Sequence, residues 1–295
     1  MATVVSITNP ITGAVEQVDK LDHTAQQIDD AVALAPQLSN PNLLDNWYFG
    51  NPVNQRNVSG AIDAVGYFLD RWKLVSGSVT IGSNGITLNG TIAQILETAV
   101  GTDVTASALT TEGVVVASYD NNSKTISLTG TGQTFVAAKL ELGSQQTLAH
   151  KDANGNWVLN DIPDYGEQLR RCRRYQRKIF ISMLTATYVW NQMIQFSLND
   201  VLNGMRATPA LTLVGKQMDT ATPSTDGFMA VVPGGNGDSG WTASAGTTYS
   251  LLVENNSITI KAIIPESKFT VTSNSGLNYA LHCGEGVYIF ADANL

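Results

Sequence analysis

The sequence predicts a mainly β protein: an N-terminal α-helix (a short coiled coil), then two antiparallel, jelly-roll-like β-sandwich domains joined by a basic helix. Short alternating runs recur every ~8–12 residues with turn residues between them, which is typical of antiparallel sandwiches. One early segment instead has helical spacing. Charged residues make up only 14 % of the chain and Gly is abundant at 26, which suits turn-rich sheets with an uncharged polar surface.

Residues 1–40 are expected to attach the chain to a partner and to oligomerise it. Residues 1–16 read as a loop or short strand, and Pro36 ends the helix that follows. The spacing of that helix indicates a short parallel coiled coil, or an amphipathic helix lying on its own domain. A helix of this length is marginal alone, so the domain behind it has to contribute to assembly. The predicted oligomerisation seam consists of Val18, Leu21, Ala25, Ile28, Val32 and Ala35.

Residues 41–150 are predicted to form the first β-sandwich. The stretch from Asn40 to Trp72 holds Trp47, Tyr48 and Phe49 in a row, so we expect it to anchor the core. Asn-Gly at positions 84 and 85 is a strong hairpin signal between two alternating runs. The strand candidates are Leu69–Leu74, Val79–Leu88, Ile92–Leu96, Val104–Leu109, Gly113–Tyr119, Lys124–Leu128 and Thr134–Leu142.

Residues 151–178 are predicted to be a linker loop followed by a helix over Tyr165–Lys178. This helix is strongly basic, which in other proteins marks contact with nucleic acid or with a membrane surface. In a chain with a net charge of −8, ion pairs between these cations and carboxylates of the same assembly are the favoured interpretation. The basic residues are Arg170, Arg171, Arg173, Arg174, Arg177 and Lys178.

Residues 179–295 are predicted to form the second β-sandwich, with a hairpin turn at Asn255-Asn256. Flat aromatic side chains on such sandwiches often stack against sugars or contact partners. Trp241 is the preferred candidate, because it directly follows the glycine-rich loop 234–240 and loops often carry function. The full set of ligand-binding candidates is Trp241, Tyr249, Trp190 and Tyr188.

No catalytic constellation is evident, so we expect no enzyme, no cofactor and no metal. Standard metalloprotease, nucleotide-binding and hydrolase motifs are absent, and the loop after His150 lacks the later Glu of a calcium loop. Asp70 beside Arg71 reads as an ion pair at a strand end. Cys172 and Cys283 are far apart and read as two free thiols. The carboxylates are scattered along the chain and cannot be paired from the sequence, so the sequence does not exclude the carboxylate pair of a glycosidase.

Five segments occur in an order and spacing that resemble a known family. They are NPNLLDNWYFGNPVNQR (40–56), YFLDRWKL (67–74), KLELGSQQTLAH (139–150), DYGEQLRRCRRYQRK (164–178) and MRATPALTL (205–213). Together they resemble tail-fibre or appendage proteins, of the receptor-binding type, from phages and prophages of gut Firmicutes. Asn57 departs from the family, which usually has Gly after the QR pair.

The resemblance implies a virion component made in the cytoplasm of the host bacterium. It would be a homotrimer whose N-terminal segment contacts other virion proteins, and whose sandwiches attach to a glycan or protein of the host surface. The alternatives are a purely structural virion component (baseplate, collar or head decoration) or a glycan-cleaving depolymerase. The acidic balance argues against nucleic acid. No apolar run reaches the ~18 residues that a membrane span needs, so no insertion is expected.

Overall fold

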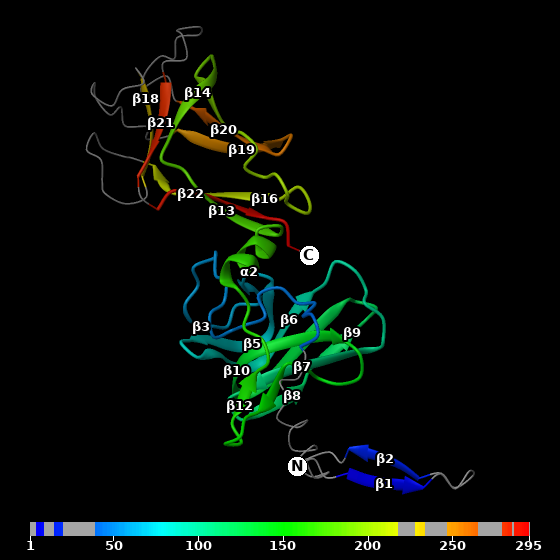
Figure 1. The fold of residues 1–295 in the computed structure, drawn as a ribbon. Helices are drawn as coiled ribbons and strands as arrows, with labels where there is room; N and C mark the ends of the chain where they lie inside the picture. Colours follow the sequence, from blue (N-terminus) through cyan, green and yellow to red (C-terminus); the bar gives the residue numbers. More distant parts are fainter. Residues whose placement is uncertain are drawn as a thin grey trace.

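The computed structural model is mainly β, built from antiparallel sheets (Figure 1). It describes residues 4–8, 15–19, 39–217, 228–233, 247–264, 279–284 and 286–294. Two separate hydrophobic cores organise the chain. The first draws its side chains from residues 43–159 and the second from residues 179–291. We refer to the parts around them as the first and the second β unit.

The N-terminal residues that are described form a two-stranded hairpin of β1 (Val4–Thr8) and β2 (Val15–Asp19). Val18 lies in β2 opposite Val5, so the prediction that a helix starts at Val18 was wrong. The β-branched strand VVSIT offers a partner for VEQVD, and cross-strand pairing outweighs the helical spacing there. The other five seam residues, Leu21 to Ala35, lie outside the described residues.

The first β unit is an eight-stranded sheet with the strand order β3-β5-β6-β10-β7-β8. Strand β4 pairs with β5, and β9 pairs with β10. The long strand β10 bends at a register shift between Thr131 and Gln133, which lets its two halves pair with β6 and β7. The strands are β3 (Gly60–Ile62), β4 (Gly66–Leu69), β5 (Trp72–Gly82), β6 (Gly85–Ile95), β7 (Val104–Thr110), β8 (Gly113–Val116), β9 (Ser118–Asp120) and β10 (Thr125–Leu142). A small hairpin of β11 (Ala149–Lys151) and β12 (Trp157–Leu159) packs against the same core.

The aromatic opening stretch anchors the first core, as predicted. Trp47, Phe49 and Trp72 are buried, and the rings of Phe49 and Trp72 meet edge to face with centroids 5.2 Å apart. The Trp72 indole N–H donates to the carbonyl of Asn46 at 2.9 Å. Tyr48 is only half-buried and packs against the edge of this core.

The predicted strand Leu69–Leu74 was wrong, because the chain turns back in the middle of it. Strand β4 ends at Leu69 and β5 starts at Trp72, with Asp70 and Arg71 in the turn and Arg71 at a positive φ of 71°. Both side chains of the turn are buried and pair elsewhere, as described below, which offsets the unfavourable backbone conformation.

The second β unit has two sheets, of three strands (β13-β22-β16) and seven strands (β17-β18-β21-β14-β15-β20-β19). Side chains from both sheets form the second core, so this unit is sandwich-like. The predicted turn at Asn255-Asn256 is confirmed, and both residues have positive φ. The strands are β13 (Gln176–Phe180), β14 (Met183–Trp190), β15 (Met193–Leu198), β16 (Ala210–Val214), β17 (Lys216–Gln217), β18 (Phe228–Pro233), β19 (Thr248–Glu254), β20 (Ser257–Ile263), β21 (Tyr279–Cys283) and β22 (Tyr288–Asp292).

Helix α2 (Tyr165–Cys172) lies between the two units (Figure 1). Asp164 caps it by accepting a hydrogen bond from the backbone N–H of Glu167 at 2.8 Å. The helix ends at Cys172, not at the predicted Lys178. Residues from Gln176 onward pair with β22 as strand β13, and this pairing takes the last basic residues out of the helix.

Candidate functional site

The exposed face of the seven-stranded sheet is the candidate binding site. It is centred on the hairpin of β14 and β15, which is closed by Asn191 and Gln192, both at positive φ. The side chains of Tyr188 and Trp190 project from β14 on this face and are 42 % and 58 % exposed. Val189 between them points inward and is buried.

A β-bulge sets the alternation that exposes both rings. The pairing register shifts between Ala186 and Tyr188, with Thr187 as the extra residue. Thr187 faces outward, where its hydroxyl contacts Ser197 Oγ at 3.1 Å. Without the extra residue, the inward position of Ala186 would place Tyr188 inward as well.

The cross-strand register places apolar and polar side chains beside the rings. Trp190 lies opposite Met193, which lies opposite Ile263 on β20. In the neighbouring row Tyr188 lies opposite Gln195, which lies opposite Lys261. The face therefore combines two aromatic rings with an amide and an ammonium group. We call the six residues Tyr188, Trp190, Met193, Gln195, Lys261 and Ile263 the aromatic face.

The other two sequence candidates do not join the aromatic face in the structure. Tyr249 pairs with Ala262, which is buried, so the Tyr249 ring lies on the inner side of the sheet and packs against the second core. Trp241 lies outside the described residues. Sequence analysis named Tyr188 and Trp190 but not Gln195 and Lys261, because cross-strand neighbours depend on a register that the sequence does not reveal.

A second polar constellation lies at the junction between the two β units. The Asp70 carboxylate is buried there and accepts hydrogen bonds from the backbone N–H of Gln55 at 2.9 Å and from its side-chain amide at 2.6 Å. It also accepts one from the side-chain amide of Gln176, which opens strand β13 of the second unit. A carboxylate of the first unit is thus hydrogen-bonded by the first strand of the second.

Arg56 forms the second link across this junction. Its guanidinium donates to the Asp292 carboxylate on β22 at 2.7 Å and to the side-chain oxygen of Gln176 at 2.9 Å. The same group lies over the rings of Tyr67 and Phe290, with distances to the centroids of 5.3 and 5.0 Å. Arg56 therefore bonds to the second unit while its guanidinium lies near one aromatic ring from each unit.

The Asp70–Arg71 turn and helix α2 contribute a third link at the junction. The buried Arg71 guanidinium pairs with Asp45 at 3.1 Å and lies 3.5 Å from the centroid of the Tyr175 ring. Arg171 of helix α2 pairs with the same Asp45 carboxylate at 2.7 Å. The predicted ion pair between Asp70 and Arg71 was wrong, since each of these neighbours points to different partners.

The basic segment is largely engaged with its own chain, as the favoured interpretation expected. Arg171 pairs with Asp45, and Arg174 pairs with Glu97 of the first unit at 3.2 Å. Arg170 pairs with Glu167 within the helix, and Arg177 donates to backbone carbonyls. Lys178 lies over the Tyr288 ring, 4.1 Å from its centroid.

Cys172 is buried and Cys283 half-buried, and both are free thiols. Burial raises the pKa of Cys283 to about 12 and also raises the pKa of Cys172, so both thiols stay protonated and weakly nucleophilic. Within the described part of the chain, no group of three His, Cys, Asp or Glu is arranged to hold a metal ion. No helix in that part is long and apolar enough to cross a membrane.

Comparison with models of known protein families, with curated proteins and with solved structures found no match to this chain.

The first prediction concerns the pH dependence of the junction. Burial raises the pKa of Asp70 from 3.8 to about 6, although the hydrogen bonds from Gln55 oppose the shift. The folded state therefore binds the Asp70 proton more tightly than the unfolded state. The stability that this proton contributes is fully present below the ordinary pKa of 3.8 and is lost as the pH rises through about 6. We expect urea unfolding to show a loss of up to about 3 kcal/mol from this group between about pH 4 and pH 7. Asp70→Asn should remove that loss.

Asp292→Asn is the matched control, because its effect has the opposite sign. Burial alone would raise the pKa of Asp292, but hydrogen bonds from Asn294 and Arg56 outweigh burial and lower it. The contribution of Asp292 is therefore present above its ordinary pKa and is lost as the pH falls below that value. An Asp70→Asn variant that keeps the full pH dependence of the parent would contradict this account of the junction.

Proposed function

We propose that the chain is a non-enzymatic virion appendage protein that attaches to a glycan of the bacterial surface. The exposed Tyr188–Trp190 pair is the observation that carries this proposal. Two large aromatic side chains on one face are costly to expose in water, and such a face suits a ligand with an apolar surface. The apolar C–H face of a sugar ring is such a surface.

The neighbours of the rings supply the polar half of this recognition. The Gln195 amide both donates and accepts, and the Lys261 ammonium donates, so both can bond to sugar hydroxyls beside a stacked ring. A flat, open face suits a chain-like polysaccharide better than a small metabolite, which needs a deeper cavity. The resemblance of the five sequence segments to phage tail-fibre proteins supports the same function.

A homotrimer is the assembly that this function favours. The seam Leu21 to Ala35 would associate as a short coiled coil and leave the jelly-roll-like sandwiches to project from it, with the N-terminal segment bound to another virion protein. Several copies of a weak glycan site on one particle increase the overall avidity. A purely structural role, as in a baseplate, collar or head decoration, is the second candidate. This structural role is favoured by the many side chains that join the two units at the junction, because they bond to one another and are not arranged around a ligand.

The second prediction tests the aromatic face. Fluorescently labelled full-length protein should bind cells, or purified wall polysaccharide, of a susceptible Gram-positive gut strain. Trp190→Ala should weaken this binding about fivefold or more and Tyr188→Ala/Trp190→Ala should abolish it, since a ring stack is worth about 1 kcal/mol or more. The measurement is the midpoint of a binding curve by flow cytometry.

Phe180→Ala is the matched control for this experiment. Phe180 is also an exposed aromatic residue, at 68 %, but it lies on β13 in the three-stranded sheet. Its removal should leave binding unchanged. Equal binding by the parent and the double variant would refute the aromatic face as the site. Failure of the parent to bind any strain would leave the structural role as the better account.

The third prediction concerns assembly and is tested by light scattering. The full chain should have a mass near three times the monomer mass of 31.5 kDa. A chain starting at Pro41 should be monomeric if the N-terminal seam is the assembly device. A trimer without residues 1–40 would instead assign assembly to the β units, and a full-length monomer would refute the trimer.

A further inference from the structure

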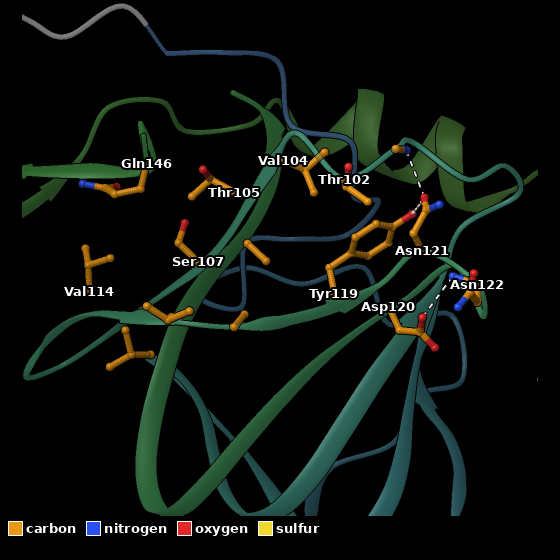
Figure 2. A pocket seen from close by; sticks show the side chains of 15 residues that line it. Thr102, Val104, Thr105, Ser107, Val114, Tyr119, Asp120, Asn121, Asn122 and Gln146 are labelled. Atoms are coloured by element: carbon orange, nitrogen blue, oxygen red, sulfur yellow. Dashed lines mark hydrogen bonds between the residues drawn. The ribbon is translucent and has the colours of Figure 1, made fainter. Parts of the chain in front are cut away.

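An open hollow of about 760 Å³ lies on the first β unit, and none of its lining residues belongs to the aromatic face or to the polar junction. It is formed where the chain leaves β8 and starts β9, with β7 as one wall and the segment after β10 as another. Figure 2 shows Ser107 in the middle of the lining, with Val114 to one side and Tyr119 to the other.

The lining combines apolar and polar surface, and Asp120 is the one charged side chain in it. Hydroxyls, amides, one phenol ring and several methyl groups make up its surface, and no Lys or Arg contributes. The single carboxylate, Asp120, accepts hydrogen bonds from the backbone N–H of Asn122 at 3.0 Å and from the Ser123 hydroxyl at 2.7 Å. Both donors are neutral, so the carboxylate keeps its charge. An anionic ligand would find no Lys or Arg here and would meet the charge of Asp120, so the lining suits an uncharged ligand.

The ring of Tyr119 is held in place at one end of the hollow. Its hydroxyl accepts from the backbone N–H of Val100 at 3.3 Å and donates to Asn121 Oδ1 at 3.3 Å. Asn121 Oδ1 also accepts a hydrogen bond from the backbone N–H of Gly101 at 2.9 Å. Since the Asn121 oxygen is used, its NH₂ group is the part left to donate to a ligand.

Ser107 provides the second, independent indication of a ligand. Its side chain is 2 % exposed, and its hydroxyl has no hydrogen-bond partner among the described residues. The neighbouring hydroxyl on the same strand face, that of Thr105, is satisfied by the carbonyl of Gly143 at 2.6 Å. A buried hydroxyl without a partner is unfavourable and uncommon in folded proteins. A hydroxyl group of a ligand in the hollow would supply the missing partner after a χ1 rotation of Ser107.

We propose that this hollow is a second binding site, on the first β unit, for one or two residues of a neutral saccharide. The sugar ring packs against Tyr119 and the neighbouring methyl groups. Its hydroxyls bond to the Ser107 hydroxyl and to the Asn121 NH₂ group. The site uses no residue of the aromatic face, so it stands whether or not that face binds glycan.

The experiment follows methyl signals of the full chain by NMR with labelled valine and alanine. Val114, Val115 and Val116 line the hollow and report directly on its occupation. The probes are maltotriose, galactotriose and triacetylchitotriose, which are soluble and neutral. The background is the Tyr188→Ala/Trp190→Ala variant, so that binding at the aromatic face does not contribute. We expect saturable shifts of the lining methyl signals with at least one probe.

Ser107→Ala should weaken that binding roughly fivefold or more without lowering the unfolding temperature, because the hydroxyl has no partner to lose. Ser118→Ala is the matched control, since Ser118 is exposed on β9 and does not line the hollow. It should leave both quantities unchanged. Ala106→Val, which adds two methyl groups to the wall, should reduce binding as well.

Three outcomes would overturn the proposal. The first is the absence of saturable shifts with all three saccharides. The second is a Ser107→Ala variant that binds as tightly as its parent. The third is a Ser107→Ala variant that unfolds, because this would show that the hydroxyl already has a structural partner.

Discussion

The Asp70 carboxylate is buried between the two β units, and the arrangement of the chain depends on satisfying it. A buried carboxylate is costly unless it is hydrogen-bonded, so donors must reach it from every side. Gln55 supplies two of these from the first unit, and Gln176 supplies one from the first strand of the second unit. Arg56 then bonds to Gln176 on β13 and to Asp292 on β22, two residues that lie opposite each other in the paired strands. Separation of the units would break the bond from Gln176 to Asp70 and the bonds from Arg56 to Gln176 and Asp292, while Gln55 would stay bonded to Asp70.

Most of the segments that carry the resemblance supply residues to this junction. Residues 40–56 supply Asp45, Gln55 and Arg56. Three of the other four segments supply the Asp70–Arg71 turn, helix α2 with Gln176, and Arg206, whose backbone N–H donates to the carbonyl of Arg174 at 2.8 Å. Four of the five segments thus meet at one junction, although they are distant in sequence. They supply side chains that join the two units, while the proposed ligand surfaces lie elsewhere, on the aromatic face and in the hollow.

The sequence predicted what is local and missed what depends on register. Alternation and Asn-rich turns identified most strands and the hairpin at Asn255-Asn256, and the aromatic stretch identified the first core. The turn at Asp70–Arg71 was missed because its two polar side chains are buried by residues more than a hundred positions away, such as Gln176. The pairing of β13 with β22 shortened helix α2 for the same reason. Tyr188 and Trp190 were named as candidates, but the bulge at Thr187 that exposes them, and the unpartnered hydroxyl of Ser107, have no signal in the sequence.

The central claim is that the polar junction couples the two β units into one cooperative structure. Differential scanning calorimetry of the full chain and of Gln176→Ala tests it most directly, because Gln176 contacts Asp70, Arg56 and Asn294 at once. For the parent we predict one transition for both units, with equal calorimetric and van't Hoff enthalpies. In Gln176→Ala that transition should split into two, with one unit unfolding at a lower temperature. Two separate transitions in the parent, or a single unchanged transition in the variant, would contradict the account.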